Sequence, residues 1–220
     1  MNEDADRELL RLVRQKLYTP VVGDILDKFG YTKQFLPNNI RPMESSMKIV
    51  GRAMPVLVSD AYGVQEKPYG LLTEALDQLM PNEIYVASGV VQPVASWGEL
   101  LTAVALQRGA VGSLIDGFYR DTPQILGQDF PVFGRGPSGQ DSSLRSVVRD
   151  FRTEIEIGGV KITPGDLLFG DFDGVLVIPR EVEAEVIELA LGKVSTEKEI
   201  FTKISEGMSA TDAFAKYGVF

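Results

Sequence analysis

The stretch that decides the fold runs from Trp97 to Asp121 and reads WGELLTAVALQRGAVGSLIDGFYRD. The apolar residues of its first half recur at helical spacing and predict one buried helix face, made of Leu100, Leu101, Val104 and Ala105. Gly109 stands just past that helix, where a glycine often ends a helix. Residues 111–115 form a short apolar run that predicts a buried strand, and Asp116-Gly117 ends it with a turn. We therefore expect a helix, a strand and a loop, in this order.

Charged residues at the two ends of this stretch are expected to lie together. A helix that feeds a strand folds back on itself, so Glu99 at the helix start comes near Arg120 and Asp121 after the strand. Carboxylate oxygens can bind a hard divalent cation, and a guanidinium can grip a ligand carboxylate with two hydrogen bonds. The backbone N–H groups of Leu100 and Leu101 at the helix N-terminus favour an anionic ligand. The pattern thus predicts a site for a small acidic molecule.

A purely structural interpretation of the same residues is also open. Asp121 or Thr122 would then cap the next helix, with Pro123 at its first position. Arg120 would be a solvated surface charge, and Glu99 would only stabilise the positive end of its helix. Local pattern alone does not decide between the two interpretations.

Composition excludes several classes of site and partner. The chain of 220 residues contains no cysteine and no histidine, which excludes thiolate nucleophiles, cysteine zinc sites and histidine-dependent triads. A metal ion would have to be held by oxygen atoms, which indicates Mg²⁺, Mn²⁺ or Ca²⁺. The net charge of −9 argues against a nucleic-acid partner. The acidic, polar N-terminus is no signal peptide and no apolar run reaches membrane-spanning length, so we expect a cytoplasmic protein with no membrane partner.

The remaining segments alternate between helix and strand patterns. We expect helices over residues 4–17, 20–29 (capped by Thr19), 68–80, 123–127, 181–206 and 209–216, and strands over 48–58, 84–87, 131–133, 151–157, 160–162, 167–169 and 175–178. Residues 171–174, Asp-Phe-Asp-Gly, are interpreted as a hairpin turn in preference to a metal site. This order predicts a single α/β domain over residues 1–220 with mixed sheets, N-terminal helices within 4–30 and a C-terminal helical region over 181–220.

Residues 134–139 read Gly-Arg-Gly-Pro-Ser-Gly and match the G-x-G-x-x-G pattern of dinucleotide-binding turns. Pro137 and the polar run over residues 140–143 do not suit a helix that begins under the glycines. The match also falls late in the chain. We therefore interpret it as a plain loop.

The stretch 97–121 resembles the signature of the 4-hydroxy-4-methyl-2-oxoglutarate aldolase/RraA-like family. Aldolases of that family carry an acidic residue, twenty intervening residues and then Arg-Asp, and Glu99 with Arg120-Asp121 has this spacing. The flanking Trp-Gly-Glu-Leu-Leu and Ile-Asp-Gly-x-x-Arg-Asp match as well. The resemblance runs from about Thr19 to Phe220. It implies a β/β/α swivelling sandwich that assembles as homotrimers or hexamers with sites between subunits.

The same resemblance implies an enzyme activity. It predicts a divalent-metal-dependent (class II) aldolase that cleaves a 4-hydroxy-2-oxo acid, such as 4-hydroxy-4-methyl-2-oxoglutarate, to pyruvate. Oxaloacetate decarboxylation is then a side activity, because it passes through the same enolate. Asp121 would bind Mg²⁺ or Mn²⁺, Glu99 would hold the ion through water, and Arg120 would bind the substrate 1-carboxylate. The expected substrate-binding backbone belongs to Gly98, Leu100 and Leu101.

Further alternatives remain within the family. A glutamate from the C-terminal region, Glu197 or Glu199, would reach the site of an adjacent subunit. The RraA branch is associated with binding and inhibiting an RNA-processing endonuclease, and the charge of −9 suits such a regulator as well as an enzyme. A third hypothesis is a related metal-dependent lyase or dehydratase that acts on another hydroxy acid. The intact set of Glu99, Arg120 and Asp121 favours the enzyme.

Overall fold

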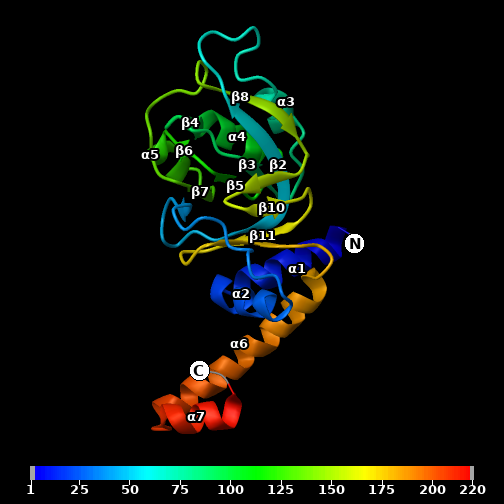
Figure 1. Cartoon of the computed structure of the whole chain (residues 1–220), viewed down its shortest axis with the longest axis vertical. Coiled ribbons are helices and arrows are strands. Elements are labelled where there is room, and N and C mark those ends of the chain that lie inside the picture. The colour runs from blue at the N-terminus through cyan, green and yellow to red at the C-terminus, as the bar shows by residue number, and fades with distance from the viewer. Residues whose placement is uncertain (1–2, 219–220) are drawn as a thin grey trace.

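A mixed sheet forms the centre of the protein in the computed structural model, which describes residues 3–218 (Figure 1). The helices are α1 (Glu3–Lys16), α2 (Thr19–Lys28), α3 (Leu72–Asp77), α4 (Glu99–Gln107), α5 (Thr122–Leu126), α6 (Glu183–Ser205) and α7 (Ala210–Tyr217). The strands are β1 (Arg41–Pro42), β2 (Ile49–Asp60), β3 (Glu83–Ala87), β4 (Ala95–Trp97), β5 (Gly112–Ile115), β6 (Phe118–Tyr119), β7 (Val132–Gly134), β8 (Ser146–Phe151), β9 (Ile155–Ile157), β10 (Val160–Ile162), β11 (Leu167–Gly170) and β12 (Val175–Ile178).

The large sheet has the strand order β1-β7-β5-β3-β2-β11-β12, and β8 also pairs with β2. Strands β2, β3, β5 and β7 are parallel neighbours, whereas β8, β11 and β12 add antiparallel edges. The long strand β2 connects the two parts, because β11 pairs with its first half and β8 with its second half. A mixed sheet with flanking helices, as the sequence predicts, is therefore confirmed.

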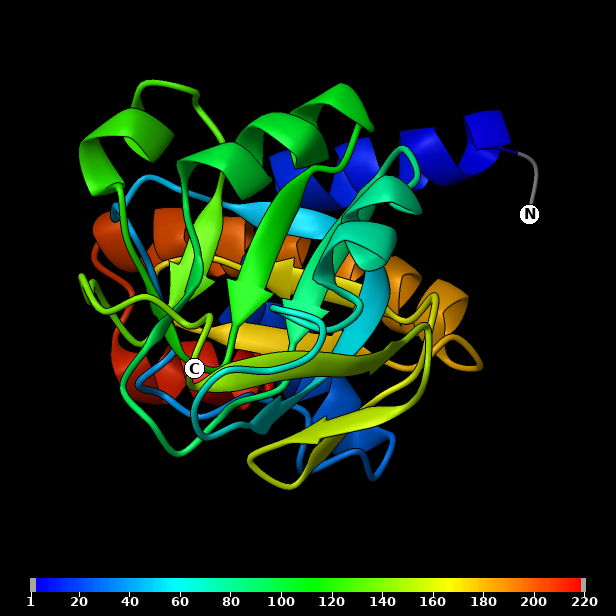
Figure 2. The same cartoon turned by 90° about the horizontal axis from the view of Figure 1, so that it is seen from above.

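The buried hydrophobic side chains form three clusters, and each cluster lies between the sheet and one of the layers that cover it. Helices α3, α4 and α5 cover one face of the parallel strands, and the β9–β10 hairpin covers the other face. Figure 2 shows α3, α4 and α5 together on one side of the strands. In β11, Leu167 and Phe169 face helices α1, α2 and α6, while Leu168 faces the hairpin cluster. This alternation is what a strand buried on both faces requires.

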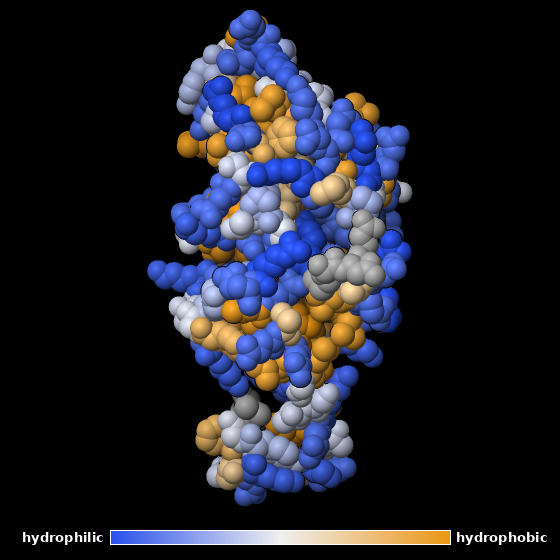
Figure 3. All heavy atoms as spheres, turned by 90° about the vertical axis from the view of Figure 1, so that its right-hand side faces the viewer, coloured by the Kyte–Doolittle hydropathy of each residue, from blue (hydrophilic) through white to orange (hydrophobic). Residues whose placement is uncertain are grey.

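The C-terminal helices extend away from this body. Figure 1 shows α6 running from the sheet to α7. In Figure 3 the molecule narrows between the body and the C-terminal arm, which consists of the end of α6 and α7. Large apolar side chains on this arm remain exposed, among them Phe201 at 73% and Phe214 at 60%. No helix among residues 3–218 is both long and apolar enough to cross a membrane.

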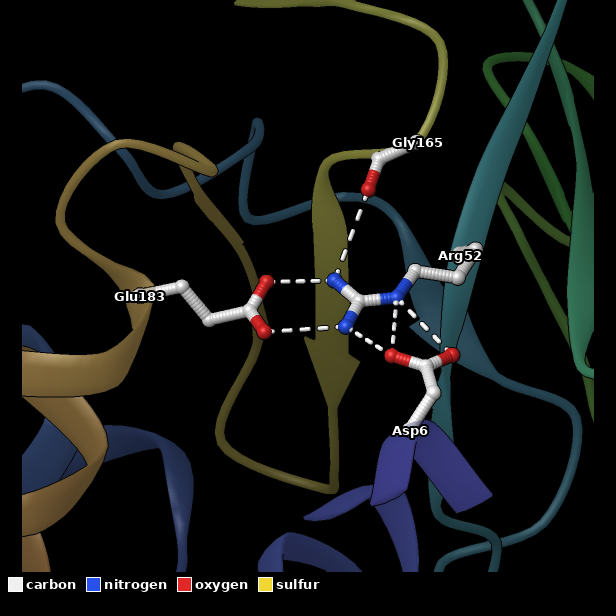
Figure 4. A network of polar contacts seen from close by, with 4 residues as sticks. All are labelled: Asp6, Arg52, Gly165 and Glu183. Carbon is white, nitrogen blue, oxygen red and sulfur yellow. Dashed lines mark hydrogen bonds and ion pairs between the residues drawn. The ribbon is translucent and has the colours of Figure 1, made fainter. Parts of the chain in front are cut away.

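A buried ionic network fastens the helices to the sheet (Figure 4). Arg52 on β2 lies between Asp6 of α1 and Glu183 of α6 and pairs with both. Its Nη1 also donates to the carbonyl of Gly165 at 3.4 Å. Burial alone would lower the pKa of Arg52, but the two carboxylates outweigh burial and raise it, so the guanidinium stays charged.

Several local predictions need correction. The helix expected over 68–80 is confined to α3, because Tyr69 and Gly70 have positive φ of 63° and 65°. The segment before α3 instead pairs with β8, where Leu71 N–H donates to the carbonyl of Val148 at 3.0 Å. The strand expected over 151–157 is two strands, broken at Arg152, whose φ is 55°.

The predicted cap of α2 is also wrong. Tyr18 takes the cap position, and Thr19 lies inside the first turn. The backbone N–H and the Oγ1 hydroxyl of Thr19 donate to Asp171 at 2.8 and 2.6 Å. Asp171 begins the predicted hairpin turn, which is confirmed by the antiparallel pair β11–β12 and by a hydrogen bond from Asp171 N–H to the Gly174 carbonyl at 3.0 Å.

The glycine pattern at residues 134–139 forms a loop, as predicted. Gly134 ends β7, and the next regular element is strand β8, so no helix begins under the glycines. The loop runs along β6, where Tyr119 N–H donates to the Gly136 carbonyl at 3.1 Å and Ser138 N–H donates to the Tyr119 carbonyl at 2.8 Å.

Candidate active site

Two short parallel strands assemble the candidate site. Strand β4 follows β3, and β6 follows β5, so both lie beyond the carboxyl ends of parallel strands, where ligands bind in open α/β sheets. Their register pairs Trp97 with Tyr119. The residues after each strand are therefore neighbours, and Arg120 N–H donates to the Trp97 carbonyl at 3.0 Å.

The structure brings Glu99 and Asp121 into contact. Glu99 N–H, at the first position of α4, donates to Oδ2 of Asp121 at 3.1 Å. Gly98 makes this approach possible, because a Cβ at that position would lie 2.7 Å from the same oxygen. A glycine is thus required here for space, not for backbone conformation, since its φ is −165°.

Asp121 does not behave as an ordinary helix cap. It occupies the cap position of α5, but its side chain accepts no hydrogen bond from that helix. Its backbone has a left-handed conformation with φ of 59°, which is uncommon for a residue other than glycine. The side chain points to the start of α4 instead. Its second oxygen, Oδ1, accepts no hydrogen bond from residues 3–218, which leaves it available to a ligand.

Arg120 lies between two carboxylates. Its Nη1 is 3.0 Å from Oδ1 of Asp141, and its Nε is 3.9 Å from Oδ2 of Asp121. Burial tends to raise the pKa of Asp141, but hydrogen bonds from Ser143 and the charge of Arg120 outweigh burial and hold that pKa below its ordinary value. Asp141 is therefore ionised near neutral pH.

A cleft of about 330 Å³ opens at these residues. Helices α3 and α4 form its walls, and Arg120, Asp121 and Asp141 lie in its lining. The apolar part of the lining consists of Leu72, Leu76, Ala95, Trp97, Leu100, Leu101 and Val104. Leu100 was expected on the buried face of its helix, but it is 75% exposed, because the start of α4 stands at the cleft.

Free backbone donors complete the site. The N–H groups of Leu100 and Leu101 lie in the first turn of α4, where no intrahelical acceptor exists. No residue of the described chain accepts a hydrogen bond from either group, whereas Thr102 N–H already donates to the Gly98 carbonyl at 3.1 Å. These two donors and Arg120 suit an anionic ligand such as a carboxylate.

The donor set also bears on a metal ion. Within residues 3–218, no three Asp or Glu side chains are grouped closely enough to enclose a cation. Mg²⁺ is commonly held by one or two carboxylates, with water and ligand oxygens filling its other positions. Asp121, with one free oxygen, fits that kind of partly hydrated ion. Glu99 meets Asp121 only through its backbone N–H; its side chain is exposed and is not among the residues that line the cleft.

Asp141 and Tyr69 are polar lining residues that the sequence did not single out as site residues. Asp141 lies in a polar run that carries no motif. Its position depends on an isolated parallel β-bridge between its backbone and that of Ala95 in β4. Tyr69 lines the cleft and donates to Oδ2 of Asp141 at 3.4 Å. Trp97 is a packing residue, since it is 1% exposed and its ring stacks on Phe130 at 6.1 Å between centroids.

Comparisons with known proteins agree with this architecture. A family model described as RraA-like, Aldolase/RraA, matches residues 19–177. Protein DlpA of Legionella pneumophila is 30% identical over 200 residues, covering 89% of this chain and 32% of DlpA, so the chain spans about a third of that protein's length. A protein of Halalkalibacterium halodurans named as a putative 4-hydroxy-4-methyl-2-oxoglutarate aldolase is 29% identical, with 89% of each chain covered.

The fold of this chain is also similar to that of a solved structure. The crystal structure of an uncharacterised protein from Pseudomonas syringae pv. tomato superimposes with a TM-score of 0.81 at 28% identity. The match covers 94% of this chain and 96% of that chain, so it includes the mixed sheet and the flanking helices.

Proposed function

Because this chain belongs to the RraA-like (Aldolase/RraA) family, we propose that it is a divalent-metal-dependent lyase that cleaves a 4-hydroxy-2-oxo acid to pyruvate. The observation that carries this proposal is the hydrogen bond from Glu99 N–H to Asp121 Oδ2, beside Arg120 and the free N–H groups of Leu100 and Leu101. Together they supply an oxygen ligand, a cation and two backbone donors at one end of a cleft. Relatives named as putative 4-hydroxy-4-methyl-2-oxoglutarate aldolases support the reaction class.

The reaction breaks the bond between C3 and C4 of the substrate. The proton leaves the 4-hydroxyl, C4 becomes a carbonyl, and the bonding electron pair passes to C3 as the enolate of pyruvate. A proton returned to C3 then completes pyruvate. The difficult part is the negative charge of the enolate, so groups that stabilise this charge decide the rate.

Arg120 and the start of α4 would bind the pyruvyl end. The planar guanidinium can hold the 1-carboxylate through two hydrogen bonds, and its charge also favours the developing enolate. The N–H groups of Leu100 and Leu101 would orient the same carboxylate. Asp141, 3.0 Å from Arg120 Nη1, fixes the position of the guanidinium before substrate binds.

Asp121 would bind Mg²⁺ or Mn²⁺ directly, and Glu99 would do so through water. When bound, such a cation supplies Lewis-acid polarisation of the 2-oxo group. Since the chain has no histidine, we assign proton transfer at the 4-hydroxyl to Glu99 acting through a water molecule. Because Gly98 has no side chain, the Asp121 carboxylate can lie against its backbone.

We also propose that the protein self-associates as a homotrimer or hexamer through its C-terminal arm. A hollow of about 450 Å³ lies between α2, α6 and α7; exposed Phe201 and Phe214 line it together with the charged residues Asp24, Lys193 and Glu197. Glu197 and Glu199 lie on α6 and remain the candidates to complete a neighbouring site; within one chain they contact Tyr18 and Tyr217. Light scattering should then give three or six times the 24.1 kDa chain mass, and a monomer would contradict this assembly.

The test of the proposed activity is pyruvate release from 4-hydroxy-4-methyl-2-oxoglutarate and from oxaloacetate, each with Mg²⁺, with Mn²⁺ and with a chelator. Metal-dependent release supports the proposal. Release from neither acid, together with capture of an RNA-processing endonuclease, would favour the regulator instead.

A further inference from the structure

A small internal cavity adjoins the candidate cleft. Its lining includes five residues that carry a hydroxyl group: Tyr69, Tyr85, Ser96, Ser142 and Ser146. The rest of the lining is apolar and comes mainly from strands β2, β3 and β8. Tyr69, Ser96 and Ser142 also line the cleft, so the two spaces are neighbours. Most of the lining residues are buried within the chain, so the cavity wall does not depend on a neighbouring subunit.

Several hydroxyl groups of this cavity are buried without a protein partner. Tyr85 is 1% exposed, Ser146 is 4% exposed and Ser142 is 9% exposed. None of their hydroxyls forms a hydrogen bond with residues 3–218. Within the same part of the chain, Ser113 Oγ is the only polar side-chain atom that is both fully enclosed and unpartnered. The other hydroxyls therefore face open space, and the cavity is the space that they line.

The size and the chemistry of the cavity suit one water molecule. The space open to the centre of a water molecule is about 20 Å³, and about 10–15 Å³ is enough to hold one. A buried water makes about three hydrogen bonds, and each hydroxyl of the lining can donate or accept one. Such a water also satisfies hydroxyls that are costly to bury unpaired. Burial raises the pKa of Tyr85, so its hydroxyl stays protonated and neutral.

The cavity lies close to the place where the substrate carboxylate is expected. Ser142 follows Asp141, which lies 3.0 Å from Nη1 of Arg120. Ser96 precedes Trp97, whose carbonyl accepts a hydrogen bond from Arg120 N–H. In the proposed reaction Arg120 binds the 1-carboxylate, and C3 is only two bonds from that carboxylate carbon. C3 must receive a proton, and the chain has no histidine to supply it.

We propose that this cavity holds a water molecule that protonates C3 of the pyruvate enolate. The inference rests on the proposed function and adds the proton donor that the reaction requires. The electron pair of the C2–C3 double bond forms the new C3–H bond, and the C2–O bond becomes the carbonyl. The hydroxide that remains takes up the proton released from the 4-hydroxyl, so protons and charge balance. Tyr85, Ser142 and Ser146 are positioning residues, because they act on the substrate only through this water.

Two conservative variants of the full-length protein test the proton step. Tyr85→Phe and Ser146→Ala each remove one hydroxyl from the lining. Exchange of the pyruvate methyl protons with D₂O requires the proton step. Consumption of oxaloacetate or of 4-hydroxy-4-methyl-2-oxoglutarate requires only cleavage of the carbon–carbon bond, because the enol can leave the site and take its proton from solvent.

The two rates should respond differently. We expect exchange to fall at least about tenfold in both variants and consumption to fall less than about threefold, since general acid–base catalysis contributes about 10²- to 10⁴-fold. Ser113→Ala is the matched control, because Ser113 is 0% exposed on β5 but does not line the cavity. It should leave both rates as in the wild type. In a crystal structure, a water should lie about 3 Å from Tyr85 Oη and from Ser146 Oγ.

The outcomes separate this inference from the proposed function. Wild-type cleavage and exchange, with exchange unchanged in both variants, overturn the inference and keep the lyase, as does a crystal structure without water in the cavity. Exchange and cleavage that fall equally indicate a structural effect and also overturn it. A wild-type protein that does neither overturns the proposed function and this inference with it. Selective loss of exchange in both variants, but not in Ser113→Ala, supports both.

Discussion

Glu99 donates its backbone N–H to Oδ2 of Asp121 at 3.1 Å, across 22 positions of the sequence. The parallel pair β4–β6 creates this contact, because its register places the residues after Trp97 beside those after Tyr119. Asp121 reaches across to α4 from a left-handed backbone, and its second oxygen accepts no hydrogen bond from the described residues. A carboxylate held in this way at a cleft is better explained by ligand binding than by capping of α5.

Arg120→Lys should lower kcat/KM for pyruvate release by about 10- to 100-fold. An ammonium keeps the charge but loses the two-pronged geometry, and one charge-assisted hydrogen bond is worth about 1.5–3 kcal/mol. Steady-state kinetics on the preferred substrate measures the loss. Arg108→Lys is the matched control, because Arg108 forms an exposed ion pair with Asp77 outside the cleft. Equal kinetics in the two variants would refute the carboxylate clamp.

Gly98→Ala should weaken metal activation while the fold persists. The new Cβ would lie 2.7 Å from Asp121 Oδ2, so the carboxylate must move, whereas alanine tolerates the extended backbone at this position. We expect the metal concentration for half-maximal activity to rise about 10- to 100-fold, as when a supporting contact of a metal ligand is lost. Gly192→Ala is the control, because its Cβ meets no atom within 4 Å. An unchanged metal response in Gly98→Ala would contradict the role of this glycine.

The sequence predicted that the start of α4 lies near Asp121 because a helix followed by a strand must reverse direction, and the contact is made by the backbone N–H of Glu99. It did not predict Asp141, because that residue reaches Arg120 only through pairing of its loop with Ala95. Strand β8 was missed for a similar reason: the run Ser146–Phe151 shows no regular alternation, and β2 pairs with it through a shift of register between Leu57 and Val58. Long-range pairing of this kind leaves no local periodicity to detect.

Leu100 shows the other limit of helical periodicity. Its spacing places it with the apolar residues of α4, yet it is 75% exposed at the cleft. Hydrophobic spacing finds apolar faces, but it does not distinguish a face that packs on the sheet from a residue that lines a binding cleft.

Arg52→Met should lower the free energy of unfolding by about 3–5 kcal/mol, because it leaves the buried carboxylate of Glu183 without its partner. Urea denaturation measures this change. The matched control is Arg11→Met, which removes an exposed pair with Glu8 and should change stability by less than about 1 kcal/mol. If both variants lose the same stability, the network of Figure 4 does not fasten the helices to the sheet.

Asp141→Asn should show a pH-dependent loss of stability. The pKa of Asp141 is lowered in the folded protein, so its charged form stabilises the fold above the unfolded-state pKa and this contribution is lost as the pH falls through the folded-state pKa. For a partly exposed pair with Arg120, the wild-type advantage at neutral pH is about 0.5–1 kcal/mol. Denaturation at a series of pH values should show the advantage shrinking below the ordinary value of 3.8. A difference that does not vary with pH would mean that the Asp141 charge is not involved.

The central claim is a metal-dependent site that stabilises the pyruvate enolate at Asp121. The most direct measurement is exchange of the pyruvate methyl protons with D₂O, followed by proton NMR, because it needs no knowledge of the native substrate. Wild-type protein with Mg²⁺ or Mn²⁺ should exchange them, a chelator should stop the exchange, and Asp121→Asn should reduce it at least about 100-fold. Asp129→Asn, which changes another aspartate with positive φ of 52° outside the cleft, should exchange like the wild type. Exchange that persists in Asp121→Asn or with the chelator, or no exchange in the metal-loaded wild type, would contradict the claim.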